Sequence, residues 1–310
     1  MSYFCLSDYF TKFFEISKLC CIFENKKMIN IDFTRVNNVS NKSLDNLFGG
    51  LVSSINSSSV YYYTDINAFL NGIIVNSPKE NKEICLWATK WSHFNDPSEL
   101  KAGLELFTSN MDKLTKDCFQ KMVDNNHSIS FSLQKDYLPM WYMYGHYGNG
   151  IMLEFDRQKL FDKYNYRFLP CLYKDSTFFD DIISKFINFE YIDNFSDLTQ
   201  EEKVYMISLH TSLLISIIKN NYYQYENELR IIGIGNKMGF DQEDKTEFFR
   251  VRNGEPIPYV KEYFSKDFLK SVWLGPSTQD KVLSQKTIMS FLKSRGFDID
   301  VISSPIPFRP

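Results

Sequence analysis

The 310-residue sequence lacks a strong excess of charge of either sign and has only four histidines. Its 35 Lys and Arg residues stand against 38 Asp and Glu residues, so the formal net charge is −3. This near balance gives no electrostatic reason to expect non-specific nucleic-acid binding, although a local basic groove is compatible with it. The histidines are dispersed without the H-x-x-x-H spacing of a zinc site, so no zinc site is expected. They are His93, His127, His146 and His210.

Cysteine is also scarce, and the six residues present show no C-x-x-C pair and no other spacing of metal ligands. They are Cys5, Cys20, Cys21, Cys85, Cys118 and Cys171. Dispersed cysteines of this kind favour buried free thiols in a reducing compartment over disulfides. We therefore expect a cytoplasmic protein.

Long uninterrupted hydrophobic runs are missing as well. Residues 3–23 are rich in apolar side chains, but charged residues interrupt them, which a signal-peptide core or a membrane span would not tolerate. We interpret this segment as an amphipathic helix that packs on a partner protein or on the main domain. The second apolar stretch, Val204–Ile218, contains His210 and is too short to cross a bilayer. No membrane association is therefore expected.

Three nucleotide-binding and catalytic motifs are absent from the chain. There is no G-x-G-x-x-G fingerprint and no Walker P-loop, so a Rossmann domain and a P-loop nucleotidase are set aside. There is no G-x-S-x-G turn either, which makes a nucleophilic serine improbable.

What the chain has is a large apolar and aromatic content, at 44% and 16%, which suffices for a sizeable core. The length suggests one large domain, or one domain with an appendage, at ~150 residues per domain. The stretch Asn37–Ser59 is rich in Asn, Ser and Gly and predicts a linker or a weakly ordered segment. We therefore divide the chain near Ser58. Residues 1–58 form an N-terminal helical extension with its linker, and residues 59–310 form an α+β catalytic-type domain.

The second part mixes strand and helix patterns. Strands are expected at Val60–Tyr63, Ile84–Thr89, Ser128–Leu133, Ile151–Phe155 and Tyr225–Ile234. Helices are expected after Asp65, after Pro97, after Pro139 and across residues 175–220. The C-terminal part predicts a β-α-β unit whose helix, Thr278–Ser294, has Ser277 or Thr278 as its N-cap. The pattern is typical of the α+β class, or of an α/β class with a mixed sheet.

The segment Tyr225–Ile231 carries the strongest chemical signal. Strand periodicity places Glu226, Glu228 and Arg230 on one face. Two carboxylates at this spacing raise each other's pKa, while Arg230 opposes that shift. Because Glu is depleted in strands, this pattern requires either a functional site or a solvent-facing surface with one ion pair. The sequence leaves both open.

Two further segments are candidate binding elements. Asn95 and Asp96 precede Pro97, which is typical of a helix start; Asp96 is then an N-cap, or the two residues position a ligand. The serines of Ser128–Leu133 lie on one strand face and leave room for a ligand ring. Trp141 and Tyr144 are spaced to wall such a ring, although aromatic residues at helical spacing also suit a core.

Read in order, these segments resemble a bacterial family named domain of unknown function 2971. The resemblance covers about residues 60–309. The matching segments are Tyr61–Thr64, Leu86–Thr89, Phe94–Glu99, Ser130–Ser132, Met140–Gly145, Gly150–Phe155, Glu226–Arg230, Leu274–Pro276 and Ser303–Arg309.

The chain also resembles, more weakly, the NAD-dependent ADP-ribosyltransferases, in which a Glu-x-Glu strand follows a first strand with Arg or His; here Tyr62 stands at that first position. This resemblance implies a mixed or antiparallel split β-sheet flanked by helices, with NAD as the substrate and no metal. It implies that Glu228 holds the ribose and the developing cation, that Glu226 orients the acceptor and that Arg230 keeps the pair ionised or contacts phosphate. The implied cofactor-binding residues are Tyr62, Thr64, Asn95, Asp96, Ser130, Ser132, Trp141 and Tyr144.

Three functions are therefore open. The first is an NAD-using ADP-ribosyltransferase-like enzyme with an unknown acceptor, of the kind that serves as a toxin or a phage-defence effector. The second is a Mg²⁺-dependent nuclease or phosphoesterase that binds its metal through Asp96, Glu99, Glu226 and Glu228. The third is a non-enzymatic binding or regulatory domain, in which the N-terminal helix docks a partner.

Overall fold

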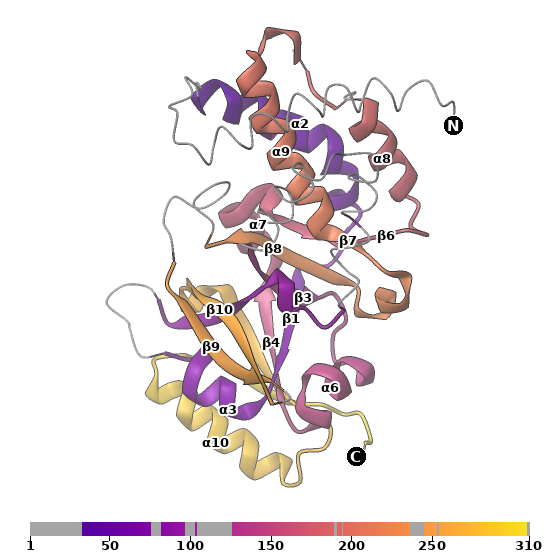
Figure 1. Ribbon diagram of the computed structural model, residues 1–310. Coiled ribbons are helices and arrows are strands. Elements are labelled where there is room, and N and C mark those ends of the chain that lie inside the picture. Colours follow the sequence, from indigo (N-terminus) through magenta and orange to yellow (C-terminus); the bar gives the residue numbers. More distant parts are fainter. Residues whose placement is uncertain are drawn as a thin grey trace.

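The structure is a computed structural model that describes residues 33–75, 82–96, 103, 126–188, 191–193, 195–235, 245–252 and 254–308. The amphipathic helix predicted for residues 3–23 and the helix predicted after Pro97 lie outside these residues. Figure 1 shows the arrangement of the described elements.

The described chain contains both helices and strands. The strands are β1 (Ser59–Thr64), β2 (Ile84–Lys90), β3 (His127–Ser132), β4 (Ile151–Asp156), β5 (Phe168–Pro170), β6 (Leu172–Tyr173), β7 (Ile218–Lys219), β8 (Glu228–Ile234), β9 (Glu247–Arg252), β10 (Glu255–Phe264), β11 (Leu269–Leu274) and β12 (Asp300–Ser303). The helices are α2 (Phe33–Ser53), α3 (Ile66–Ala68), α6 (Leu138–Tyr144), α7 (Arg157–Tyr164), α8 (Phe179–Asn188), α9 (Gln200–Ile217) and α10 (Lys281–Ser294). Short 3₁₀ or π turns complete them: η1 (Phe69–Ile73), η3 (Trp91–His93), η4 (His146–Gly148), η5 (Asn165–Arg167), η6 (Phe195–Asp197), η7 (Asn221–Glu226) and η8 (Lys266–Phe268).

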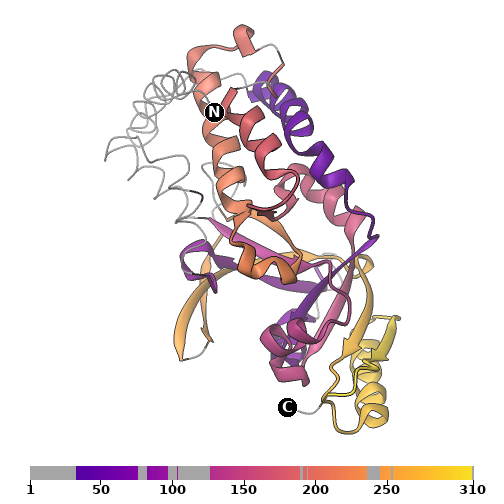
Figure 2. The same ribbon diagram turned by 90° about the vertical axis from the view of Figure 1, so that its right-hand side faces the viewer.

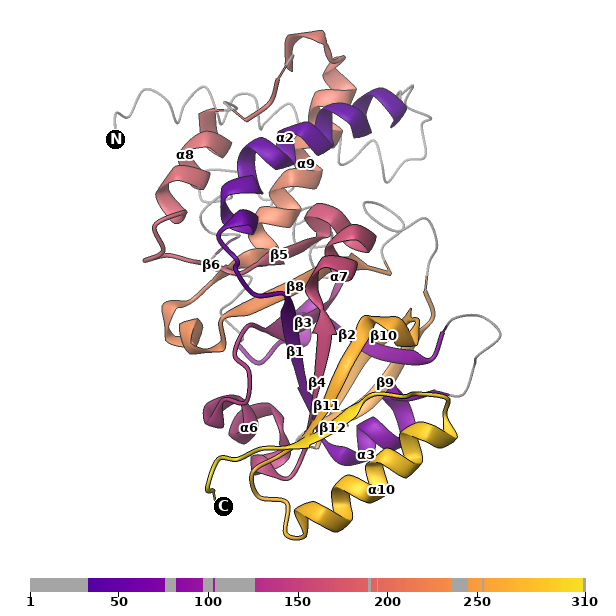
Figure 3. The same cartoon turned by 180° about the vertical axis from the view of Figure 1, so that it is seen from behind.

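The centre of the fold is one mostly antiparallel sheet with the strand order β12-β11-β4-β1-β3-β2-β10-β9. Strand β8 pairs with β3 and with β5 outside this order. Within the described sheet only β11 and β12 pair in parallel, and α10 connects them. Helices flank the sheet, as Figures 1 and 3 show. The α+β class, with a mostly antiparallel sheet between helices, is therefore confirmed.

The sheet forks at β3. Strand β8 pairs with β3 along its whole length, from His127 to Ser132. The other edge of β3 is shared: Ser132 pairs with Tyr61 of β1, whereas His127 and Ser128 pair with β2. Because β1 and β2 each hold only one end of β3, they diverge along its middle residues. This fork creates an opening within the sheet.

A helical layer made of α2, α8 and α9 packs beside β5, β6 and β8, and Figure 2 shows these helices side by side. The linker predicted for residues 37–59 is wrong, because residues 37–53 belong to α2. Apolar residues at helical spacing hold α2 in place, and their burial outweighs the helix-weakening Asn, Ser and Gly content. They are Val36, Leu44, Leu47, Phe48 and Leu51, all buried in one cluster with residues of α8 and α9. The predicted boundary near Ser58 falls between α2 and β1.

The predicted N-cap is confirmed for one helix and is wrong for another. Asp65 caps α3 as expected, since its carboxylate accepts a hydrogen bond of 2.8 Å from the Ala68 backbone N–H. The N-cap of α10 is Asp280 and not Ser277 or Thr278. Its carboxylate accepts a bond of 2.9 Å from Leu283 N, which a charged acceptor at a helix N-terminus favours.

Among the described residues, no helix is both long and apolar enough to cross a membrane.

Candidate active site

A cavity of about 1060 Å³ opens at the fork of the sheet. Its walls come from β1, β2, β3, β8, α6 and β9, so segments far apart in the sequence meet there. Ten of the eleven candidate site residues line it. They are Tyr62, Thr64, Asn95, Asp96, Ser130, Ser132, Tyr144, Glu226, Glu228 and Arg230.

Trp141 is the exception, and its predicted role as a wall for the ligand is wrong. The side chain is fully buried, outside the cavity, in a small core with Tyr63 and Met152. Its indole N–H donates a hydrogen bond of 2.8 Å to Asp136, and its ring meets Tyr63 edge-on. Trp141 therefore anchors α6 and leaves its neighbour Tyr144 facing the cavity.

Glu226 reaches the site by a different route from the one predicted. It ends the 3₁₀ turn η7, and β8 begins only at Glu228, so the two carboxylates are not neighbours on one strand. Between them Asn227 takes a left-handed conformation with φ 45°. Asn tolerates this region better than most residues. The side chains of Glu226 and Glu228 still converge, because Lys219 contacts both.

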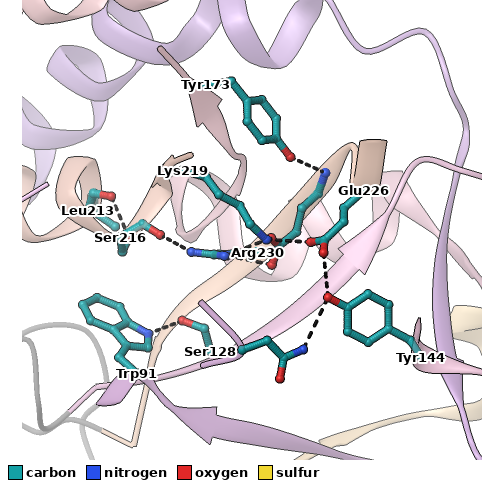
Figure 4. Close-up of polar contacts among 11 residues, drawn as sticks. Trp91, Ser128, Tyr144, Tyr173, Leu213, Ser216, Lys219, Glu226 and Arg230 are labelled. Carbon is teal, nitrogen blue, oxygen red and sulfur yellow. Dashed lines mark hydrogen bonds and ion pairs between the residues drawn. The ribbon is translucent and has the colours of Figure 1, made fainter. Parts of the chain in front are cut away.

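Glu226, Glu228 and Arg230 are buried, with exposed fractions of 3%, 5% and 2%. The alternative of a solvent-facing surface with one ion pair, which the sequence left open, is therefore wrong. Lys219, which is also buried, donates a hydrogen bond of 2.6 Å to Glu226 and another to Glu228. Two carboxylates and two cations thus form a compact neutral group at the cavity wall (Figure 4).

Arg230 makes a two-point contact with Glu228. Its Nε and Nη2 donate to the two carboxylate oxygens of Glu228 at 2.8 and 2.9 Å. Its Nη1 donates to the Ser216 carbonyl of α9 at 2.7 Å, so the helical layer helps to fix the guanidinium (Figure 4). The ring of Phe94 lies 4.9 Å from the guanidinium carbon. These contacts hold Arg230 and Glu228 in one geometry.

Glu228 is an ionised carboxylate in a buried place. Burial alone would raise its pKa, but the charges of Arg230 and Lys219 and their hydrogen bonds outweigh burial and hold the pKa well below the usual range. The backbone N–H of Glu228 donates to the Tyr173 hydroxyl at 3.3 Å. A carboxylate offers about four lone-pair positions, and within the described chain three hydrogen bonds occupy those of Glu228. Capacity remains for one ligand hydroxyl.

Glu226 is the inner end of a chain of hydrogen bonds. The Tyr144 hydroxyl donates to Glu226 Oε1 at 2.6 Å, and the Asn95 amide donates to that hydroxyl at 3.3 Å. Burial and the neighbouring Glu226 charge both raise the pKa of Tyr144. Tyr144 therefore stays protonated and acts as a hydrogen-bond donor.

The serine face of β3 divides into two structural residues and one that is open to a ligand. Ser128 accepts a hydrogen bond from the Trp91 indole, and Ser132 donates to the Glu226 carbonyl at 2.5 Å. Ser130 is the exposed residue of the strand and faces the cavity. The predicted room for a ligand ring therefore lies over Ser130.

Tyr62 faces the cavity from β1, where Thr64 also contributes to the lining. Burial raises the pKa of Tyr62, and the positive charge of Arg250 beside it partly opposes this shift. The Tyr62 ring also packs edge-on against Phe131 of β3 at 5.9 Å. Tyr62 thus faces the fork from β1, beside Arg250 of the basic strand β9.

Three basic residues of the cavity were missed. Lys219 follows Leu213–Ile218, a run that is buried throughout and apolar apart from Ser216. A single charge at the end of such a run was a usable signal, because a buried lysine needs a partner. Arg250 and Arg252 had no such signal, because they reach the cavity only through the pairing of β9 with β10 and of β10 with the distant strand β2.

Comparison with known proteins gives one match. Residues 140–231, less than a third of the chain, match a family described as protein of unknown function (DUF2971). No curated protein and no solved structure matches the chain. The matched stretch contains Tyr144, Lys219, Glu226, Glu228 and Arg230, the charged network and its tyrosine. Over residues 140–231 the chain is thus similar to the DUF2971 proteins, and the match supports that family.

Proposed function

We propose that the protein is an NAD-using enzyme of the ADP-ribosyltransferase type, which cleaves NAD and transfers ADP-ribose to an acceptor. The observation that carries this proposal is Glu228, a buried carboxylate kept ionised by Arg230 and Lys219 at the wall of a large cavity. A cavity of about 1060 Å³ is at the upper end of the usual range for small-molecule sites. A dinucleotide is of a suitable size for it.

The chemistry needs a fixed negative charge near the ribose. The bond between ribose C1′ and the nicotinamide nitrogen breaks, and its electron pair leaves with nicotinamide, which becomes neutral. The ribose then carries an oxocarbenium-like positive charge, which a nearby carboxylate stabilises. An acceptor nucleophile bonds to C1′ and gives up its proton. Glu228 would supply the negative charge and accept a hydrogen bond from a ribose hydroxyl.

The other cavity residues have matching roles. Ser130 and Tyr62 would border the nicotinamide and its ribose, since both face the opening in the sheet. Glu226 would take the acceptor's proton or orient it, and Tyr144 holds Glu226 in place through the 2.6 Å hydrogen bond. Trp141 has no direct part, because it is buried outside the cavity.

The geometry gives less support to the two alternatives. For a Mg²⁺ site, Lys219 already bridges the carboxylates of Glu226 and Glu228, and Arg230 pairs with Glu228. Asp96 lines the cavity, whereas Glu99 lies outside the described residues. The non-enzymatic alternative relied on a solvated acidic face, and that face is buried.

The test is consumption of NAD by the purified full chain and by Glu228→Gln. The substitution keeps the shape of the side chain and removes its charge, so we expect NAD cleavage to fall by about 10²- to 10³-fold. Unchanged cleavage in a folded Glu228→Gln variant would contradict the proposal.

Glu262→Gln is the matched control. Glu262 is also a buried glutamate, with an exposed fraction of 7%, and it pairs with Lys163 and Lys245. It lies on β10 and is not part of the cavity lining. Its loss should destabilise the fold in a similar way and leave NAD cleavage by the folded protein unchanged. This control separates loss of chemistry from loss of structure.

A further inference from the structure

Two arginines, Arg250 and Arg252, line the cavity from β9. They are two residues apart on an extended strand, so their side chains leave the same face. Strand β9 ends the order of the main sheet and pairs with β10, which pairs with β2. The two guanidinium groups therefore approach the cavity from the β2 side of the fork.

Both side chains are held in place by uncharged partners. Arg250 Nη2 donates to Thr89 Oγ1 of β2 at 2.9 Å, and its guanidinium carbon lies 5.4 Å from the centre of the Trp87 ring. Arg252 Nη2 donates to the His93 carbonyl at 2.5 Å. Neutral acceptors fix the two groups without neutralising them, so both can still bind an anion.

The pair also has unused capacity for an acceptor. The Nε–H of Arg250 is buried and has no hydrogen-bond partner within the described chain. Burial lowers the pKa of Arg252, and the positive charge of Arg250 lowers it further, although Glu255 partly opposes this. A buried donor without an acceptor and two neighbouring like charges are both costly. An anion between the two groups would relieve both costs.

We propose that Arg250 and Arg252 bind the diphosphate group of the ligand, which assigns that ligand to the nucleoside diphosphates and dinucleotides. Planar guanidinium groups bind phosphate oxygens in pairs, and diphosphate offers oxygens to two such groups. This inference rests on the proposed function in one respect, since it orients NAD in the cavity. The diphosphate lies near Thr89 on β2, and the nicotinamide ribose lies at Glu228.

The spacing of the strands is compatible with this orientation. In the pairing order, β3 separates β2 from β8. Thr89 lies opposite Ser128 and Glu228 opposite Ser132, so two strand spacings and four residues of β3 separate Thr89 from Glu228. At about 4.8 Å per strand and about 3.3 Å per residue, their backbones are roughly 16 Å apart. The long side chains of Arg250 and Glu228 both line the cavity, which shortens the distance that the ligand spans. Tyr62, which lies beside Arg250, would then border the ligand between its diphosphate and its nicotinamide ribose.

The test uses calorimetric titration of the full chain with inorganic pyrophosphate, a probe that contains no glycosidic bond. We expect saturable binding to the wild type and weakening by about 10- to 100-fold in Arg250→Gln and in Arg252→Gln, because each loses charged hydrogen bonds. Arg295→Gln is the control, since Arg295 contacts the ring of Phe291 on α10 and does not line the cavity. Its binding should equal that of the wild type.

The outcomes separate this inference from the proposed function. Absence of pyrophosphate binding, or equal binding in the Arg250→Gln/Arg252→Gln double variant, overturns the inference even if NAD is cleaved. Arginine-dependent pyrophosphate binding supports it even if NAD is not cleaved, and in that case the proposed reaction fails alone.

Discussion

Lys219 donates a hydrogen bond to Glu226 and another to Glu228, and all three side chains are buried. Arg230 supplies the second positive charge through its two contacts with Glu228. Two buried carboxylates so close together would repel each other strongly without these cations. The charge state of the candidate catalytic residue thus depends on a lysine that comes from a different element, at the end of β7.

At this scale we predict that Lys219→Met destabilises the protein by about 3–5 kcal/mol near neutral pH, because it leaves a buried carboxylate uncompensated. Equilibrium unfolding in denaturant measures the change. Lys159→Met is the control: Lys159 and Asp267 form an exposed pair, with side-chain exposures of 41% and 57%, so its loss should cost less than about 1 kcal/mol. Equal costs for the two variants would contradict the role of Lys219.

Lys219→Met should also change how the free energy of unfolding depends on pH. The pKa of Glu228 in the folded protein lies below its ordinary value of 4.5. Its contribution to stability is therefore present above pH 4.5 and is lost as the pH falls through the folded pKa. Without Lys219 this pKa rises, so the contribution is smaller. We expect the stability gap between wild type and Lys219→Met to narrow on acidification, and a gap that widens would contradict this explanation.

At the scale of elements, the turn between η7 and β8 determines where Glu226 points. Asn227, with its φ of 45°, is the left-handed C-cap of η7 and separates the two glutamates. The backbone N–H of Leu133 donates to the Asn227 carbonyl at 2.9 Å, which ties this turn to the end of β3. A residue that disfavours the left-handed region would therefore strain the site.

We predict that Asn227→Ala costs about 1–2 kcal/mol, whereas Asn227→Gly is nearly neutral, because only glycine adopts this conformation without penalty. Thermal unfolding of both variants measures the difference. If alanine and glycine had equal effects, the left-handed conformation would not be what holds the turn.

Helix α2 should contribute to stability as a full member of the fold. Phe48 is completely buried between α2 and the other helices of its cluster. We predict that Phe48→Ala destabilises the protein by about 3–5 kcal/mol. Leu283→Ala on α10 is the control, since Leu283 is 61% exposed and should change stability by less than about 0.5 kcal/mol. A small effect at Phe48 in denaturant unfolding would support the linker interpretation instead.

At the scale of the whole molecule, the elements with strong periodicity were predictable from the sequence. The alternation in Ser128–Leu133 identified β3, and Pro139 marked the start of α6. The composition of residues 37–59 favoured a linker, and that prediction was wrong because apolar residues at helical spacing form a helix there. Composition reports average preference, whereas burial of one helix face depends on the neighbouring helices.

The candidate site was predictable in its residues and less so in its geometry. Ten of the eleven candidate residues line one cavity. They could be recognised because each lies in a segment with a distinct polar or aromatic pattern. Trp141 differed because the direction of an aromatic side chain on a helix depends on what the helix packs against. Arg250 and Arg252 depended on strand pairing between distant segments, which a single sequence does not reveal. The fork at β3, which makes the cavity, has the same origin.

The helical layer and the forked sheet meet at the charged group, since α9 contributes the Ser216 carbonyl and β8 contributes Glu228 and Arg230. The most direct measurement is the rate at which the purified full chain releases nicotinamide from NAD, with the nicotinamide quantified by chromatography. We predict release by the wild type and by Glu262→Gln, and a loss of about 10²- to 10³-fold in Glu228→Gln. No release by folded wild-type protein, or equal release by Glu228→Gln, would contradict NAD cleavage at Glu228.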